Sequence, residues 1–147
     1  MKKLIYSITI QKPPHVVFEK MTDKTLYPDW ARAWGEGMTY EGEWKEGHHI
    51  SFMDKSQGGT KVRVEQVIPD EAIKMVHVAM VNTENYEHEI TDETMRKWIG
   101  TREDYFFKAE GEDATTLEVI MHTDETFEEM MGAWNQALQY LKQLCEA

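Results

Sequence analysis

The stretch from Thr126 to Ala147 constrains the fold most, because it has the pattern of one long amphipathic helix. Its apolar residues recur at alternating steps of four and three, which places them on one helical stripe. That stripe consists of Phe127, Met131, Trp134, Leu138, Leu141 and Cys145. At ~1.5 Å per residue the helix would be roughly 30 Å long, so the stripe needs a large apolar partner surface. Thr126 and Glu129 fit a capping box at its start, and Asp124 is an alternative N-cap.

The segments before this helix have the alternation of strands, from Leu4 to Ile10 onward. Strands are predicted at 4–11, 38–44, 49–54, 61–68, 72–81, 101–109 and 115–123. Two short helices are expected at 15–21 and 29–34. The polar stretch 82–100 is more typical of an insertion or lid, with a short helix at 93–99.

Successive strands with helices at the ends indicate an antiparallel α+β fold. We therefore predict a curved antiparallel sheet of about six to seven strands wrapped around the long C-terminal helix, with two short helices after the first strand. Residues 1–147 are expected to form one domain.

The charge balance narrows the set of partners. The chain has 27 acidic and 16 basic residues and a net charge of −11, which disfavours nucleic acid and anionic membranes because both need a basic surface. No apolar run approaches the ~20 residues of a membrane-spanning helix. The first residues are read as a strand instead of a secretion signal, and a cytoplasmic location is expected. The lone Cys145 lies on the helical stripe, where we expect a buried, inert thiol.

Dispersed residues resemble a known family. Ile8, Ile10, Pro13, Val16 and Phe18 resemble its first strand and first helix, and Tyr27-Pro28-Asp29-Trp30 its second short helix. Its closing helix, in which a Gly-Trp pair precedes spaced leucines, is similar to Gly132-Ala133-Trp134 with Leu138, Leu141 and Leu144; here Ala133 separates the pair. The order of elements resembles the helix-grip fold of the START-like (SRPBCC) superfamily, and within it the Aha-type family, named for activators of the Hsp-ninety chaperone ATPase.

The resemblance implies a cavity between sheet and closing helix that often holds an apolar or aromatic small molecule. Strand alternation and the helical stripe suggest which side chains face inward. The candidate ligand-binding residues are Trp30, Trp34, Phe52, Met75, His77, Tyr105, Phe107, Met121, Met131, Trp134 and Leu138. Val64, Val81 and Val119 are also expected to face inward, and Trp98 to close the end opposite Trp30 and Trp34. Aromatic faces and adaptable methionines suit a flat apolar ligand, but the same residues could fill the interior completely.

His77 is the main polar candidate, since it would point inward from a strongly apolar strand. It could hydrogen-bond a ligand or act as an acid or base. Alternatively, it is a core histidine whose ring is satisfied by Tyr105 or a backbone carbonyl. His48-His49 and His88-Glu89 lack the spacing of a metal site, and neither a metal nor a cofactor is predicted.

Three functions follow as hypotheses. The first is non-catalytic binding of a small hydrophobic or aromatic ligand between the sheet and the C-terminal helix. The second, which rests on the resemblance alone, is a co-chaperone-like protein-interaction domain with a chaperone partner; we expect no second domain for clamping a chaperone, which counts against it. The third is an enzyme of the polyketide cyclase/dehydratase type using His77, with Tyr105 as a helper. The sequence leaves open whether the chain assembles into a homodimer.

Overall fold

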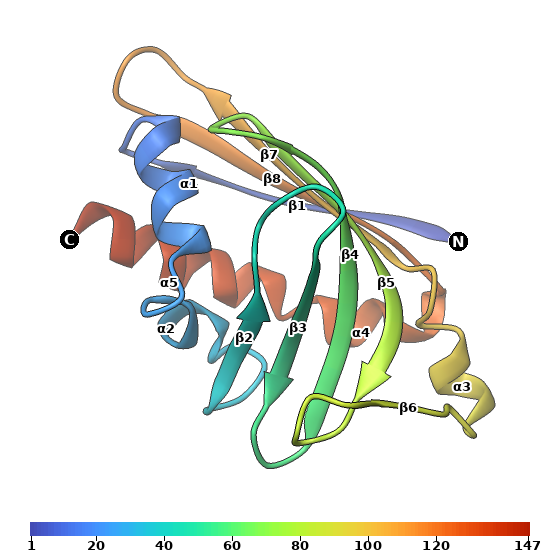
Figure 1. Ribbon diagram of the computed structural model, residues 1–147. Helices are drawn as coiled ribbons and strands as arrows, with labels where there is room; N and C mark the ends of the chain where they lie inside the picture. The colour runs from blue at the N-terminus through green and yellow to red at the C-terminus, as the bar shows by residue number, and fades with distance from the viewer.

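A computed structural model describes residues 1–147. The chain forms one antiparallel sheet of eight strands with helices packed against it (Figure 1). The strands are β1 (Lys2–Ile10), β2 (Met38–Gly42), β3 (His49–Asp54), β4 (Gly58–Ile68), β5 (Ala72–Val81), β6 (Glu87–His88), β7 (Arg102–Ala109) and β8 (Thr115–Thr123). Their order across the sheet is β1-β8-β7-β5-β4-β3-β2, with β6 pairing with β5. The seven predicted strands are all present, and only the two-residue β6 was not anticipated.

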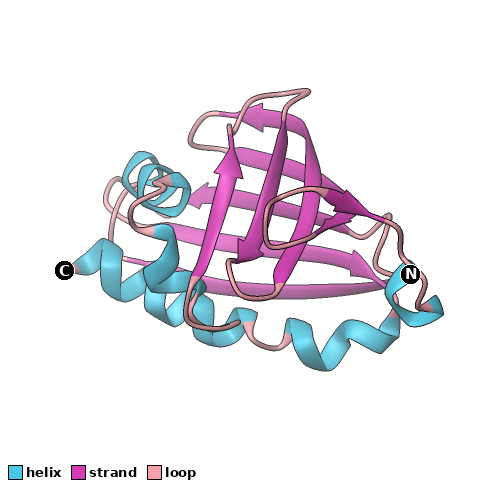
Figure 2. Ribbon diagram, turned by 60° about the horizontal axis from the view of Figure 1, so that its bottom comes forward, coloured by secondary structure: helices cyan, strands magenta, loops and turns pink.

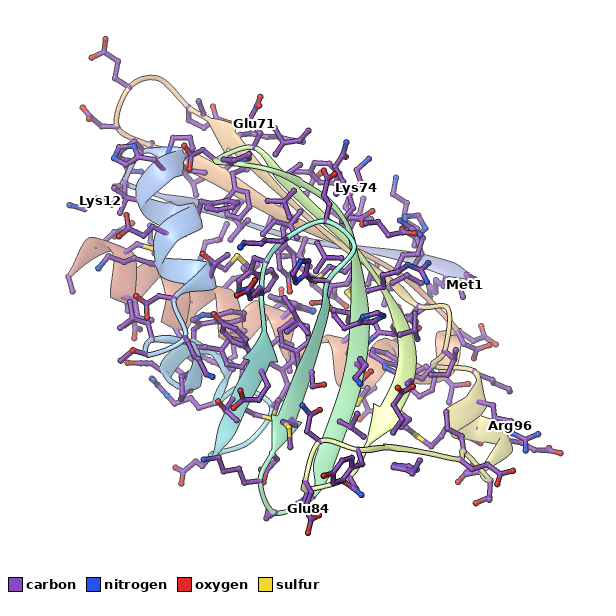
Figure 3. All side chains as sticks on the ribbon, viewed as in Figure 1. Met1, Lys12, Glu71, Lys74, Glu84 and Arg96 are labelled. Atoms are coloured by element: carbon purple, nitrogen blue, oxygen red, sulfur yellow. The ribbon has the colours of Figure 1, made fainter.

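The helices lie along one side of this curved sheet, as Figure 2 shows. They are α1 (Pro14–Thr22), α2 (Tyr27–Ala31), α3 (Glu93–Arg96), the 3-10 turn η1 (Glu125–Phe127), α4 (Glu128–Met131) and α5 (Trp134–Glu146). The architecture is therefore the predicted α+β helix-grip arrangement. Charged side chains such as Lys74 and Arg96 project outward from it (Figure 3). No helix combines the length and the apolar character needed to cross a membrane.

The long C-terminal helix is present as predicted, but it is interrupted at Gly132 and Ala133 instead of being continuous. The backbone forms a turn at Gly132 and Ala133, where Ala133 N–H donates to Met130 O and Asn135 N–H donates to Gly132 O. These bonds span three residues instead of four, so the helix tightens locally at its weakest helix former. The predicted capping box does not form either, because the carboxylate of Asp124 accepts from Thr126 N–H at the start of η1.

The apolar stripe nevertheless packs as expected. Leu138 is 2% exposed and Leu141 is fully buried. Cys145 is buried beside them and is part of the same core. The sheet supplies the opposing wall, with Leu117, Val119 and Met121 of β8 all fully buried. The apolar faces of the sheet and the helix thus pack against each other, and this burial of apolar surface is the main source of stability for the layered fold.

A register shift between β4 and β5 decides which residues of β5 face inward. The ladder pairs Lys61 with Ala79 but Val62 with His77, so β5 holds one extra residue at this point. Beyond this β-bulge the faces exchange, and Met80 instead of Val81 lies on the inner face opposite Thr60. Val81 is buried but stands outside the main core, so its predicted inward placement was wrong.

A candidate ligand cavity beside the C-terminal helix

A cavity of about 510 Å³ lies between the sheet and the turn that joins α4 to α5. Its walls come from α2 and the loop after it, from β2, β3, β4, β5 and β7, and from the chain around α3, α4 and the start of α5. The aromatic lining residues are Tyr27, Trp30, Trp34, Phe52, Trp98, Tyr105 and Trp134. Methionines fill much of the remaining apolar wall, namely Met38, Met80, Met95, Met130 and Met131. The interior is therefore not completely packed.

The structure brings together seven of the eleven predicted ligand-binding residues. Those lining the cavity are Trp30, Trp34, Phe52, His77, Tyr105, Met131 and Trp134. The other four, Met75, Phe107, Met121 and Leu138, are buried in the core and do not reach the cavity. Phe107, for example, packs edge-on against Phe18 of α1, with ring centroids 5.3 Å apart. The interior is thus solid near α1 and hollow near α2.

Trp134 is the centre of the aromatic wall. Its ring stacks on Trp30 at a centroid distance of 5.9 Å and meets Trp34 edge-on at 4.8 Å. Tyr105 contacts it from the sheet side at 5.6 Å. Trp134 is the first residue of α5, so the interruption at Gly132 and Ala133 sets its position at the cavity. Rings in these mutual orientations form a rigid apolar surface.

The segment between β5 and β7 closes another side of the cavity through Trp98. Gly100 N–H donates to His77 O, and His77 N–H donates to Thr101 O, both at 2.8 Å. These bonds fasten the segment to β5 and hold the Trp98 ring 4.6 Å from the His77 ring. The polar insertion predicted at 82–100, with its short helix α3, therefore supplies part of the site. Trp98 lines the same cavity as Trp30 and Trp34.

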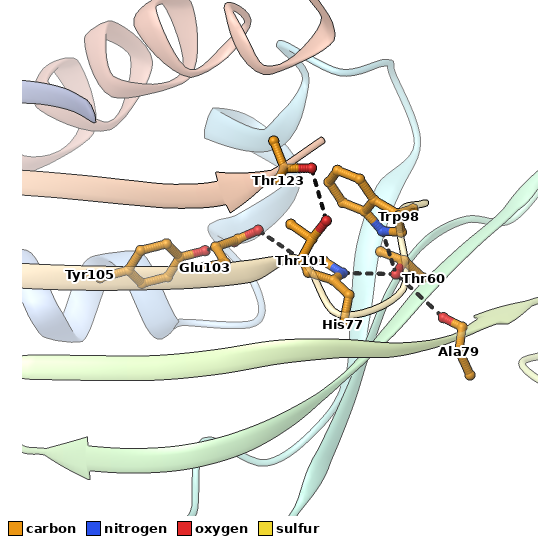
Figure 4. Close-up of polar contacts among 8 residues, drawn as sticks. All are labelled: Thr60, His77, Ala79, Trp98, Thr101, Glu103, Tyr105 and Thr123. Atoms are coloured by element: carbon orange, nitrogen blue, oxygen red, sulfur yellow. Dashed lines mark hydrogen bonds and ion pairs between the residues drawn. The ribbon is translucent and has the colours of Figure 1, made fainter. Parts of the chain in front are cut away.

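A chain of hydrogen bonds runs along the cavity wall (Figure 4). Trp98 Nε1–H donates to Thr60 Oγ1 at 3.0 Å, and Thr60 Oγ1 lies 2.8 Å from His77 Nδ1. His77 Nε2 lies 3.1 Å from Oε1 of Glu103, whose other oxygen accepts from the hydroxyl of Tyr105. His77 is thus held by Thr60 and Glu103, not by Tyr105 or a backbone carbonyl.

The network places a proton on Nε2 of His77. The Glu103 carboxylate only accepts hydrogen bonds, so the Nε2–H donates to it. Thr60 Oγ1 accepts from Trp98 and lies 2.8 Å from His77 Nδ1 and 3.4 Å from Ala79 O. Burial, with the nearby Glu103 charge, raises the pKa of Tyr105 well above its ordinary 10.0. Tyr105 is therefore a hydrogen-bond donor at neutral pH, and His77 is the group suited to proton transfer.

Glu103 and Thr60 are functional candidates that the sequence prediction missed. Glu103 alternates with Tyr105 and Phe107 along β7, so the same period-2 pattern places it on the inner face. Thr60 alternates in the same way with Val62 and Val64 on β4, but the predicted strand began only at Lys61. In both cases the signal was present, but a carboxylate and a residue beside glycines are usually read as exposed.

Comparison with known proteins shows the fold. The sequence matches no protein-family model and no curated protein sequence. Among solved structures, it is similar to protein MLL2253 from Mesorhizobium loti, with a TM-score of 0.77 at 14% identity over 99% of this chain and 97% of that one. An Aha1 dimer from Colwellia psychrerythraea gives 0.72 at 17% identity, over 99% and 97%. CalU16 from Micromonospora echinospora gives 0.69 at 19% identity, over 97% of this chain and 75% of that one.

Proposed function

We infer that the fold which this chain shares with the Aha1 and CalU16 structures is the START-like, SRPBCC-type helix-grip fold. We propose that, as a single domain, it binds a small hydrophobic or aromatic ligand in the cavity beside Trp134 without transforming it. The observation that carries this proposal is the presence of the cavity itself. Its volume of about 510 Å³ falls within the ~300–1,000 Å³ of typical small-molecule sites.

The composition of the wall supports an apolar ligand. Tryptophan rings offer flat faces for stacking, while methionine side chains adjust to the outline of different ligands. Trp34 is half-buried and contacts both the cavity and Trp134, so it is well placed to touch a ligand without being essential to the core.

A paired substitution tests this assignment. 2-Naphthylmethanol serves as a neutral, flat probe, and its binding is followed by isothermal titration calorimetry. We expect saturable 1:1 binding that weakens about tenfold in Trp34→Ala, through the loss of one aromatic contact. Tyr86→Ala is the matched control, because Tyr86 is 65% exposed and lies outside the cavity. Absence of saturable binding, or equal loss in both variants, would contradict the proposal.

An enzyme of the polyketide cyclase/dehydratase type is the second candidate. It is favoured by one specific observation, that His77, Glu103 and Tyr105 all reach the cavity. In this reading His77 transfers protons and Glu103 orients its ring. Turnover of an aromatic polyketide-like substrate, lost in His77→Gln with the affinity for the substrate retained, would establish catalysis. A parent chain that binds the substrate but leaves it unchanged supports binding alone.

Protein partners form the remaining alternative. The likeness to an Aha1 dimer supports testing a homodimer, and the family resemblance supports testing a chaperone partner. Light scattering after size-exclusion chromatography measures the first, and a pull-down with a purified Hsp-ninety chaperone measures the second. A monomer that captures no chaperone would remove both.

A further inference from the structure

The charged residues of the cavity wall are all of one sign. Glu36, Asp54 and Glu103 line the cavity, whereas no lysine or arginine does. The whole chain adds to this field with a net charge of −11. A concave site lined by one sign of charge concentrates ions of the opposite sign.

Two of these carboxylates come from segments that lie close to each other. Asp54 ends β3, and Glu36 lies in the loop before β2. A Cβ atom placed on Gly37 would lie 3.7 Å from Asp54 Oδ2, so this loop passes close to the Asp54 carboxylate. Neither Glu36 nor Asp54 forms an ion pair. Hydrogen bonds from the Ser56 hydroxyl and backbone N–H lower the pKa of Asp54 and keep it charged.

The third carboxylate lies deeper. Glu103 is 8% exposed and has no cationic partner other than the His77 ring. His77 Nε2–H points at one Glu103 oxygen, the Tyr105 hydroxyl donates to the other, and no lysine or arginine pairs with this carboxylate. Glu103 thus adds a third carboxylate to the cavity, beside the aromatic wall around Trp134.

We propose that the cavity selects ligands that carry a protonated amine, or another organic cation, on an apolar body. This inference rests on the proposed function, since it concerns the same cavity. Faces of tryptophan and tyrosine attract cations through their ring quadrupoles, and the carboxylates add direct attraction. A ligand carboxylate would instead meet three like charges and no lysine or arginine, and burying an unpaired charge is costly.

Three probes with one aromatic body separate charge from shape. They are 2-naphthylmethylamine, which is protonated at neutral pH, 2-naphthylmethanol and 2-naphthoate, each titrated calorimetrically into the full chain. We expect the amine to bind about tenfold or more tightly than the alcohol, and the carboxylate to bind weakest. Equal affinities, or preference for the carboxylate, would overturn the inference while leaving hydrophobic binding intact. Failure of all three to bind would overturn both.

Charge-neutralising variants then locate the effect. Asp54→Asn and Glu103→Gln should each reduce the preference for amine over alcohol several-fold, while binding of the alcohol changes little. Glu118→Gln changes the net charge by the same amount, but Glu118 pairs with Lys108 outside the cavity. An equal reduction in this control would show that overall charge is responsible and would contradict a local site. Because Asp54 is part-exposed, its variant tests the inference even if Glu103→Gln fails to fold.

Discussion

The Nε2 atom of His77 lies 3.1 Å from Oε1 of Glu103, on the wall of a cavity otherwise rich in tryptophan and methionine. The second Glu103 oxygen accepts from the Tyr105 hydroxyl. One buried carboxylate thus satisfies two donors from two different strands. Such a network is stabilising only while every member has its partner.

Substituting Glu103→Gln tests this network through stability. A glutamine amide is neutral and has one acceptor oxygen, so both donors lose their charged partner and one of them is left without an acceptor. We expect the free energy of unfolding to fall by about 2 kcal/mol, measured by urea denaturation. Glu118→Gln, which removes an exposed pair with Lys108, should change it by less than about 1 kcal/mol. Equal losses would mean that the Glu103 carboxylate is not the acceptor of these bonds.

Two leucines of α5 test the packing of helix against sheet. Leu141 is fully buried, while Leu144 is only partly buried at the edge of the core. Leu141→Ala should cost about 2–5 kcal/mol of unfolding free energy, through lost burial and the cavity left behind. Leu144→Ala should cost clearly less by the same urea measurement. The reverse order would place the wrong face of the helix against the sheet.

A glycine at the cavity tests the close approach of β3 and β4. A Cβ atom on Gly59 would clash with Phe52 O and lie 2.7 Å from Met53 Cα, both in backbone positions that cannot move aside. Gly59→Ala should therefore destabilise the protein by about 3 kcal/mol or more, or prevent folding. The control is Gly47→Ala, where the added atom meets open space and only a left-handed φ of +82° costs about 1–2 kcal/mol. Circular-dichroism melting curves compare the two, and similar losses would contradict the tight strand pairing.

Alkaline pH should destabilise the protein, because the fold buries one cysteine thiol and two tyrosine hydroxyls in their protonated forms. Burial raises the pKa of Cys145 from 9.0 to about 11, and burial also raises those of Tyr27 and Tyr105 above 10.0. Between its unfolded and folded pKa values each group is charged only in the unfolded state, so stability falls as the pH rises. Cys145 alone should contribute up to about 1.4 kcal/mol per pH unit between pH 9 and 11.

The variant Cys145→Ala isolates that contribution. Urea unfolding at a series of pH values should show a shallower loss from about pH 9 upward, while the loss above about pH 10 from the tyrosines remains. An unchanged slope in the variant would mean that the thiol is equally free to ionise in both states.

Much of the architecture follows from periodicity. The burial of Leu138 and Leu141 was predictable because residues spaced alternately by four and three lie on a single face of an α-helix. The order of strands and short helices was predictable because apolar alternation and turn residues mark their limits. The exchange of Met80 for Val81 was not, because a β-bulge arises from pairing between β4 and β5 and leaves no local signature in either strand.

The site was harder to predict than the fold, for a physical reason. Met75 and Met121 share the inner face with Glu103, since the three pair across adjacent strands. Alternation assigns residues to a face, whereas the boundary between packed core and hollow depends on how α2 and the turn at Gly132 sit over that face. Met75 lies in the packed core, whereas His77, two residues later on the same strand, lines the cavity. Only the three-dimensional arrangement distinguishes the two positions.

The central claim is that a ligand occupies the hollow beside Trp134, and the indole N–H signals test it most directly. The chain has five tryptophans, of which Trp30, Trp34, Trp98 and Trp134 line the cavity and Trp44 does not. In a ¹H–¹⁵N NMR titration with 2-naphthylmethylamine, assigned by single Trp→Phe variants, we predict saturable shifts of the Trp34, Trp98 and Trp134 signals, with a much smaller change for Trp44. Five unmoved signals, or a change confined to Trp44, would contradict the account.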